Sequence, residues 1–227
     1  MNQNQRKNII YSLVLLTLVI AVYLYRNSGG DSKKEMMVSG VTMGVVPYNV
    51  KYLDTQERDF QIAIDSLLEG FNESLSTYIK YSEISRFNKD SVGIALSSGF
   101  FHPVLKASER IYKATNGAFD PTVMPLVNAW GFGPNKEPQA DSSSVDSLMR
   151  FVGFDLIQYS TDSVKKTRQG VQLDFSAVAK GYAVDLVGKL LQENAVEDFM
   201  VEIGGEVVCR GKNKQGQAWL IGINNPQ

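Results

Sequence analysis

The sequence predicts an α+β protein with a mixed, largely antiparallel sheet and flanking helices, preceded by an N-terminal membrane-spanning helix. Strand-like and helix-like segments alternate irregularly over residues 36–227, whereas a doubly wound fold would alternate them regularly. Two strand-like runs meet at Gly204-Gly205, which is typical of a turn. A separate apolar stretch at residues 9–25 comes before the folded part.

The apolar stretch at residues 9–25 is at the short end of the lengths that cross a bilayer. Its last residues are bulky, whereas signal-peptide cleavage needs small residues, and Tyr23 and Tyr25 suit a membrane interface. We therefore expect an uncleaved anchor, with a cleaved signal segment as the alternative. Residues 1–8 would be a cytoplasmic tail and residues 26–35 a linker. The long domain that follows is expected in the periplasm, held at the inner membrane.

The composition excludes several classes of function. A formal net charge of −1 argues against a nucleic-acid-binding surface, which would be basic. The chain has one cysteine, Cys209, and one histidine, His102, so it contains neither a disulfide framework nor a zinc cluster. Any metal would have to be a hard cation bound by oxygen atoms. Cys209 lies in the strand-like run VVCRG, and we expect it to be buried.

The folded part begins with two strands and a helix. Residues 38–53 are rich in β-branched and aromatic residues, and Gly44 and Pro47 interrupt them, which predicts a strand, a bend and a second strand. The stretch from Thr55 to Ser76 repeats apolar residues at spacings of three and four, which predicts a helix. Asp54 or Thr55 would cap this helix.

Further helices and short strands complete the prediction. The helix expected at 103–115 has Pro103 in its first turn and Gly117 beyond its end. The run SEISRFN is typical of a turn followed by a helix, with Ser82 and Ser85 as caps and Arg86 paired with Glu83 or with a phosphate. Two more helices are expected at 143–151 and 176–192, and short strands at 94–98, 171–175, 199–212 and 217–224.

The C-terminal end of the sequence leaves the predicted sheet unprotected. The last predicted strand stops at INNPQ, and neither a helix nor a cap follows it. Intact domains usually cover or blunt such a sheet edge. We therefore expect that the sequence lacks the C-terminal part of its domain.

The run LDFSAVAKGYAVDLV, from Leu173 to Val187, predicts a strand that passes into a helix through Asp174 and Ser176. The first N–H groups of a helix are unpaired and, together with the helix dipole, favour an anion. Lys180 lies one turn into the helix and could reach back to a phosphate. Gly181 costs roughly 1 kcal/mol against Ala inside a helix, which predicts that something packs closely there. The alternative is an ordinary amphipathic helix with a solvated lysine.

Two acidic residues, Asp120 in GAFDP and Asp174, complicate a simple anion site. A carboxylate about 4 Å from a phosphate costs on the order of 4 kcal/mol at an effective dielectric constant of 20. Either a sugar hydroxyl donates a hydrogen bond to the carboxylate, or a divalent cation lies between the two charges. The pattern therefore favours Mg²⁺ and a polyphosphate. For Asp120 an equally good interpretation is a residue that starts an Asp-Pro turn.

Five motifs together resemble one protein family. In order along the chain they are TMG, STYIKYSEISRFN, TNGAFDPTVMPLVNAWGFG, LDFSAVAKGYAVD and VEIGGE. This series is similar to the ApbE family of FAD:protein FMN transferases, which are exported and often tethered to a membrane. The resemblance covers residues 36–227, and its third and fourth motifs are the specific ones.

The resemblance implies a substrate, a metal and a partner. Such enzymes bind FAD and Mg²⁺, cleave the diphosphate and attach FMN through a phosphoester to a threonine of an acceptor flavoprotein. The positions that match FAD-contacting residues of the family are Met43, Tyr78, Ala118, Phe119, Asp120, Asp174 and Lys180. Ala177 matches a position whose backbone carbonyl binds magnesium. The His-containing segment, the Asp and the Thr with which the family completes its site are absent, so the catalytic base stays unassigned.

Other functions remain open at this stage. Some members of the family hydrolyse FAD to FMN and AMP, so an FAD pyrophosphatase is the first alternative. A non-catalytic flavin-binding protein tethered to the membrane is the second. A structural domain, in which the motifs serve only packing, is the third. In the leading interpretation Lys180 and the helix N-terminus give electrostatic support to phosphoryl transfer.

Overall fold

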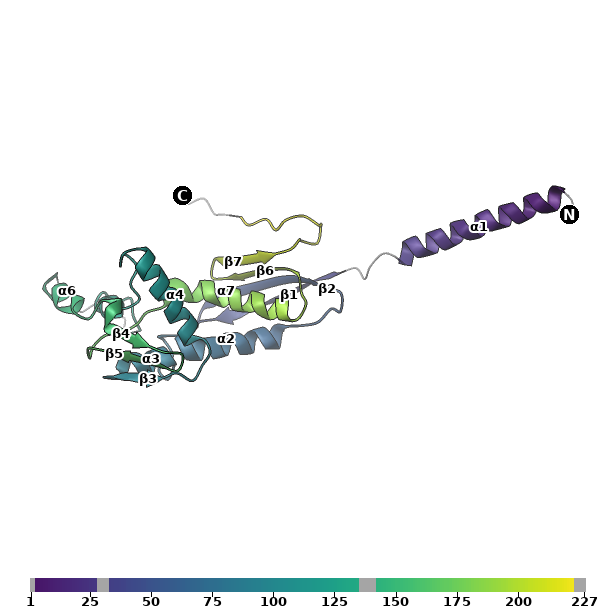
Figure 1. Ribbon diagram of the computed structural model, residues 1–227. Helices are drawn as coiled ribbons and strands as arrows, with labels where there is room; N and C mark the ends of the chain where they lie inside the picture. The colour runs from purple at the N-terminus through teal and green to yellow at the C-terminus, as the bar shows by residue number, and fades with distance from the viewer. Residues whose placement is uncertain (1–2, 28–32, 135–141, 223–227) are drawn as a thin grey trace.

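The computed structural model describes residues 3–27, 33–134 and 142–222, and it confirms an α+β fold with antiparallel sheets and flanking helices (Figure 1). One sheet has the strand order β1-β2-β6-β7 and a smaller one has the order β3-β5-β4. The strands are β1 (Lys34–Thr42), β2 (Val46–Asp54), β3 (Gly93–Ala95), β4 (Ile157–Tyr159), β5 (Ser163–Lys166), β6 (Asp198–Ile203) and β7 (Glu206–Arg210). The helices are α1 (Gln3–Asn27), α2 (Gln61–Leu75), α3 (Glu83–Lys89), α4 (Phe101–Ala114), α5 (Met124–Ala129), α6 (Ser142–Met149), the 3₁₀ helix η1 (Phe154–Leu156) and α7 (Ser176–Glu193).

The four-stranded sheet contains the two predicted strands β1 and β2 as a hairpin. Its register runs from the pair Lys34–Asp54 to the pair Thr42–Val46. The turn between the strands places Met43 and Gly44 at positive φ, a conformation that suits the glycine. The predicted strand–bend–strand pattern is therefore confirmed, and β1 begins within the residues that were expected to be a linker.

The main core lies between this sheet and helices α2 and α7, which Figure 1 shows along the same face of the sheet. Both strands of the second hairpin, β6 and β7, contact α7. An added Cβ at Gly188 of α7 would lie 3.2 Å from the Phe199 ring and 3.4 Å from Val208, so the glycine permits this close packing. The predicted helix at 176–192 is confirmed, since α7 is Ser176–Glu193.

The prediction that Cys209 is buried is wrong, because this residue is exposed. Side chains of a strand alternate between the two faces of the sheet. Val208 is the residue of β7 that packs towards α7, so its neighbour Cys209 lies on the opposite face. The strand was identified correctly, and only the face was misjudged.

Helix boundaries differ from the predictions at several places. Helix α2 begins at Gln61 rather than at Thr55, and no side chain caps it at Phe60. Asp54 instead accepts hydrogen bonds from the backbone and the guanidinium group of Arg58. Ser82 is confirmed as the cap of α3, since its hydroxyl accepts from the backbone of Ser85, whereas Ser85 itself lies inside the helix.

Two strand predictions are wrong. The 171–175 segment, which is Val171 to Phe175, forms a single β-bridge at Gln172 and no ladder. Its burial nevertheless alternates as in a strand, with Val171, Leu173 and Phe175 buried. Residues 217–222 are irregular, and the rest of the strand expected at 217–224 lies outside the described residues. Of the small sheet β3-β5-β4, only the strand at 94–98 had been expected. Helix α5 had not been expected.

The apolar N-terminal stretch is helical, since α1 runs from Gln3 to Asn27. Across residues 3–27, 33–134 and 142–222, no helix has both the length and the apolar character needed to cross a membrane. The predicted transmembrane anchor is therefore not confirmed.

Candidate flavin nucleotide site

Asp174 forms a turn directly before the N-terminus of α7. Its Oδ1 accepts hydrogen bonds from the Ser176 backbone N–H at 2.9 Å and from the Ser176 hydroxyl at 2.5 Å. A carboxylate in this place also interacts favourably with the helix dipole. Within the described part of the chain Oδ2 receives no hydrogen bond, so one oxygen of Asp174 is free for a ligand.

Asp120 repeats this geometry in the GAFDP loop. Its Oδ1 accepts from the Thr122 backbone N–H at 2.8 Å and from the Thr122 hydroxyl at 2.6 Å. The interpretation of Asp120 as the start of a turn is thus confirmed. The turn also serves the fold, because the Thr122 hydroxyl accepts a hydrogen bond from Gly153 at 2.7 Å. As with Asp174, Oδ2 has no donor among the residues that the structure describes.

The two aspartate turns lie side by side. The backbone N–H of Asp174 donates to the carbonyl of Pro121 at 2.7 Å, and Val123 forms a parallel β-bridge with Gln172. Two segments that lie far apart in sequence therefore run together at the start of α7. The structure brings Asp120 and Asp174 together, as the sequence pattern implied.

Lys180 points to a different neighbour than the one expected. Its ammonium group donates to the Gly204 carbonyl at 3.0 Å and lies 3.6 Å from the carboxylate of Glu206. The lysine therefore joins α7 to the β6–β7 turn and does not reach back to Asp174. Gly204 in turn donates to the Pro47 carbonyl at 3.0 Å, which places the β1–β2 turn with Met43 next to the same region.

The first turn of α7 has open polar groups. Ala177 is exposed, and its N–H has no acceptor among the described residues. An added Cβ at Gly181 would meet nothing within 4 Å, so the packing partner expected there is absent from the described residues. A side chain four residues further along a helix lies over the preceding turn, and the missing Cβ thus leaves space beside the Ala177 carbonyl.

These groups fit part of a magnesium site. Mg²⁺ usually keeps several waters and binds through one or two carboxylates plus substrate phosphates. Asp174 Oδ2 would supply one carboxylate oxygen, and the Ala177 backbone carbonyl would supply a second oxygen ligand. The described residues contain no group of three or more His, Cys, Asp and Glu side chains that could hold a metal by themselves. A metal here would need further ligands from a substrate or from water.

The other residues that were predicted to contact FAD lie in the loops around the aspartate turns. Ala118 is exposed and Phe119 is half-buried in a turn after α4, where the Phe119 N–H donates to the Thr115 hydroxyl at 3.1 Å. Gly117 ends α4 at positive φ, as predicted. Tyr78 is 63% exposed and lies at one side of a cleft. Tyr78 thus has a large aromatic face available for stacking.

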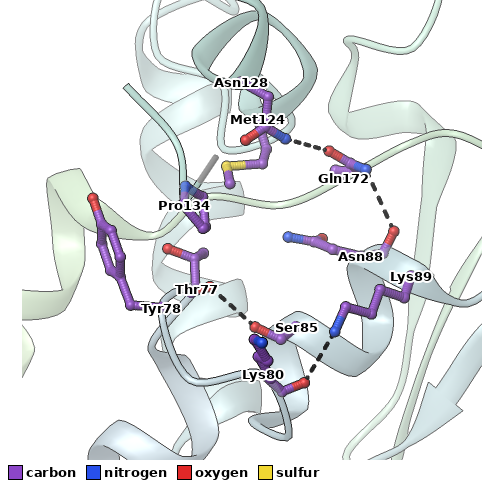
Figure 2. A pocket seen from close by; sticks show the side chains of 10 residues that line it. All are labelled: Thr77, Tyr78, Lys80, Ser85, Asn88, Lys89, Met124, Asn128, Pro134 and Gln172. Atoms are coloured by element: carbon purple, nitrogen blue, oxygen red, sulfur yellow. Dashed lines mark hydrogen bonds between the residues drawn. The ribbon is translucent and has the colours of Figure 1, made fainter. Parts of the chain in front are cut away.

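The cleft beside Tyr78 has a volume of about 350 Å³ (Figure 2). Two hydrogen bonds run along one wall: the Asn128 side chain donates to the Gln172 side chain at 3.0 Å, and the Gln172 side chain donates to the backbone carbonyl of Asn88 at 3.5 Å. The lining residues are Thr77, Tyr78, Lys80, Ser85, Asn88, Lys89, Met124, Asn128, Pro134 and Gln172. Gln172 lies two residues before Asp174 on the same side of an extended segment, so the cleft and the aspartate turns face one region.

The sequence analysis missed the amides of this cleft. Asn88, Asn128 and Gln172 come from α3, α5 and the 171–175 segment, and no local pattern links them. Asn88 and Asn128 lie within motifs that had been noted, SEISRFN and TNGAFDPTVMPLVNAWGFG, but the spacing in these motifs gives no sign of the role.

A buried glutamate joins α2 to the loop that follows β3. Glu83 accepts hydrogen bonds from Ser74, from the backbone and hydroxyl of Ser97, and from Ser98. Burial by itself raises the pKa of Glu83, but these hydrogen bonds outweigh it and lower the pKa below its usual value. Arg86 is 4.0 Å from this carboxylate, so the predicted pair is present only at the limit of an ion pair.

Comparisons with known proteins agree with the site. The sequence model of the ApbE family matches residues 43–227. The chain is 38% identical over 229 residues to a Haemophilus influenzae protein named FAD:protein FMN transferase, covering 93% of this chain and 65% of the relative. It is 37% identical over 201 residues to the Vibrio cholerae protein of that name, covering 85% of this chain and 60% of the relative. The chain thus spans less than two thirds of the length of these two relatives.

Solved structures show the same likeness. The flavin transferase ApbE from Vibrio cholerae superimposes with a TM-score of 0.79 at 38% identity, covering 86% of this chain and 65% of that one. The apo form of the Pseudomonas stutzeri flavinyl transferase ApbE gives a TM-score of 0.77 at 31% identity, covering 84% and 63%. With the paired aspartate turns, the open N-terminus of α7 and a family match over most of its length, this chain belongs to the ApbE family.

Proposed function

We propose that the chain is the flavin-nucleotide-binding part of an FAD:protein FMN transferase. The observation that carries this proposal is the hydrogen bond from Asp174 to Pro121, because it joins the GAFDP turn to the N-terminus of α7. The junction offers two carboxylate oxygens, an unpaired helix N–H and a nearby ammonium group. Such a mixture of charges suits a diphosphate that is bound together with a divalent cation.

The proposed reaction is phosphoryl transfer from FAD to a threonine hydroxyl of an acceptor flavoprotein. The threonine oxygen bonds to the phosphorus on the FMN side, and the bond from that phosphorus to the bridging oxygen breaks. AMP leaves with the bridging oxygen, and the threonine proton passes to a base that the described residues do not identify. Mg²⁺, when bound, would neutralise diphosphate charge.

The residues of this chain bind and orient in that reaction. Tyr78 and Met43 would contact the flat rings of FAD, as aromatic and thioether side chains do. The Ala177 N–H and the Lys180 ammonium group add fixed positive potential near the diphosphate. Lys180 holds its position through Gly204, so its charge is already placed before the substrate binds.

We further infer that the domain works outside the cytoplasm, attached to the inner membrane. The support is the helix α1, in which the apolar side chains from Leu13 to Ile20 are exposed and lack a packing partner in the described core. Exposed apolar side chains of this kind gain free energy when they leave water, for example at a membrane surface. Membrane fractionation of cells that produce the chain with and without residues 1–25 tests the inference, and recovery of both in the soluble fraction contradicts it.

Mass spectrometry of an acceptor flavoprotein after incubation with FAD and Mg²⁺ tests the transferase. We expect the acceptor to gain one FMN, whereas release of free FMN without labelling indicates hydrolysis. Lys180→Met is expected to weaken FAD binding about tenfold, because it removes one charge near the diphosphate. Lys189→Met is the matched control, since Lys189 lies on the same helix and its ion pair is with Glu193 at 3.6 Å, away from the aspartate turns. Equal binding by both variants contradicts the role of Lys180.

A further inference from the structure

The 171–175 segment forms no ladder with another strand of the described residues, although its burial alternates as in a strand. Val171, Leu173 and Phe175 point into the core, while Gln172 and Asp174 face the cleft and the aspartate turns. Its backbone forms one β-bridge, at Gln172. Buried backbone groups need hydrogen-bond partners, so other groups must stand in for the missing strand.

Asn88 supplies the main substitute. Its side-chain carbonyl accepts from the Leu173 N–H at 2.7 Å, and its side-chain N–H donates to the Leu173 carbonyl at 2.8 Å. A carboxamide has the same donor and acceptor as a peptide group, so it can pair with a residue as a neighbouring strand would. Leu173 has no exposed surface and directly precedes Asp174.

Lys166 supplies a second substitute. Its ammonium group donates to the Val171 carbonyl at 2.7 Å and to the Phe87 carbonyl at 2.8 Å, and it lies 4.3 Å from the centre of the Phe87 ring. Phe87 and Asn88 are consecutive residues of α3. The end of α3 therefore fixes the segment at two points, Val171 and Leu173.

We propose that Asn88 is a positioning residue, which holds Leu173 so that Asp174 and Gln172 face the nucleotide site. Both polar atoms of its amide bind Leu173, so in this proposal Asn88 acts on a ligand through the segment. A shift of one residue in the segment would turn Asp174 into the core, because alternate side chains point in opposite directions. The expected effect of Asn88 on FAD affinity rests on the proposed function. Its expected effect on the backbone of Leu173 and Asp174 does not depend on that function.

Hydrogen exchange of the whole chain tests the backbone claim. Asn88→Leu keeps the size of the side chain and removes both bonds, and we expect the Leu173 and Asp174 amides to exchange about tenfold faster or more. Asn88→Asp keeps the acceptor for the Leu173 N–H and should give a smaller change. Asn194→Ala is the control, because the Asn194 side chain donates to the Leu190 carbonyl at the far end of α7, away from the 171–175 segment. Unchanged exchange in Asn88→Leu overturns the proposal, and if that variant does not fold, Asn88→Asp decides.

FAD binding tests whether the position matters. In a parent that binds FAD, Asn88→Leu should raise the dissociation constant about tenfold, as expected for two lost hydrogen bonds. In the Asp174→Asn background the same change should have less than about a twofold effect, since Asn88 acts through Asp174. Independent, additive effects overturn the positioning role. A parent that does not bind FAD overturns the proposed function instead, and the exchange experiment then still decides the backbone claim.

Discussion

Two extended segments of this protein have the same pattern of burial but different backbone partners. Strand β6 alternates buried and outward-facing residues, and so does the 171–175 segment. The backbone of β6 pairs with β2 on one side and with β7 on the other. The 171–175 segment has one β-bridge, and the Asp174 N–H donates to the Pro121 carbonyl. The side chains of Asn88 and Lys166 bind the backbone of Leu173 and the Val171 carbonyl.

The difference shows how a strand can line a ligand site. A residue within a ladder is flanked by neighbouring strands, whose side chains lie about 5 Å away and occupy the space above it. Single side chains satisfy the backbone of the 171–175 segment without adding such a row. Gln172 and Asp174 are therefore left open to a ligand, whereas the outward residues of β6 form a closed sheet surface.

The largest expected effect comes from removing buried side chains of the two segments. Leu173 and Ile203 both have a relative exposure of 0%. We expect Leu173→Ala and Ile203→Ala each to lower the free energy of unfolding by about 3 to 4 kcal/mol, because core truncations of this size leave a cavity. Urea unfolding of the two variants and the parent measures this. A cost below about 1 kcal/mol for Leu173→Ala alone would show that the 171–175 segment is not part of the core.

The second effect concerns pH and the buried Lys166. Burial lowers the pKa of Lys166 from 10.5 to about 8 in the folded protein. Between these values the unfolded chain binds more protons, so the free energy of unfolding should rise from pH 8 to pH 10.5, by about 3 kcal/mol for this group. Lys166→Met should lack this contribution. Parallel pH profiles of the two proteins contradict the prediction, and Lys165→Met on the exposed side of β5 is the control.

The smallest effect concerns acid and the end of β2. The hydrogen bond from Arg58 lowers the pKa of Asp54 from 3.8 to about 2. Because the folded value is the lower one, this stabilisation is complete above pH 4 and is lost as the pH falls towards 2, by about 2 kcal/mol. Unfolding of the parent and of Asp54→Asn at pH 5 and pH 2.5 measures the difference. An equal acid-induced loss in both proteins would mean that Asp54 makes no contribution.

The sequence predicted the parts of the fold that depend on local repetition. The three- and four-residue spacing located α2 and α7, and the β-branched runs with Gly44 and Gly204-Gly205 located the two hairpins. The start of α2 was wrong because Asp54 binds Arg58 and Glu57 adopts a positive φ, and neither feature follows from the apolar pattern. The apolar and polar residues at 171–175 alternate, and this agrees with the side chains that are buried in the structure. The alternation contains no information on the hydrogen-bond partners of the backbone.

The site was predictable to the extent that it is built from short motifs. Asp120 and Asp174 each lie two residues before a hydroxyl side chain, and this spacing is what produces the two turns. The partner of Lys180 could not be predicted, because Gly204 approaches α7 only through the packing of β6 and β7. The amides of the cleft depend on tertiary contacts in the same way.

The outward orientation of Cys209 has a practical consequence. It is the one cysteine of the sequence and it is exposed on β7, on the face opposite α7. A thiol-reactive fluorophore would therefore label the chain at one defined point without prior mutagenesis. Partial desolvation raises the pKa of this thiol, so the labelling reaction should proceed faster in mildly alkaline buffer. Energy transfer between that label and the isoalloxazine ring of FAD would then measure the proposed nucleotide binding in the native sequence.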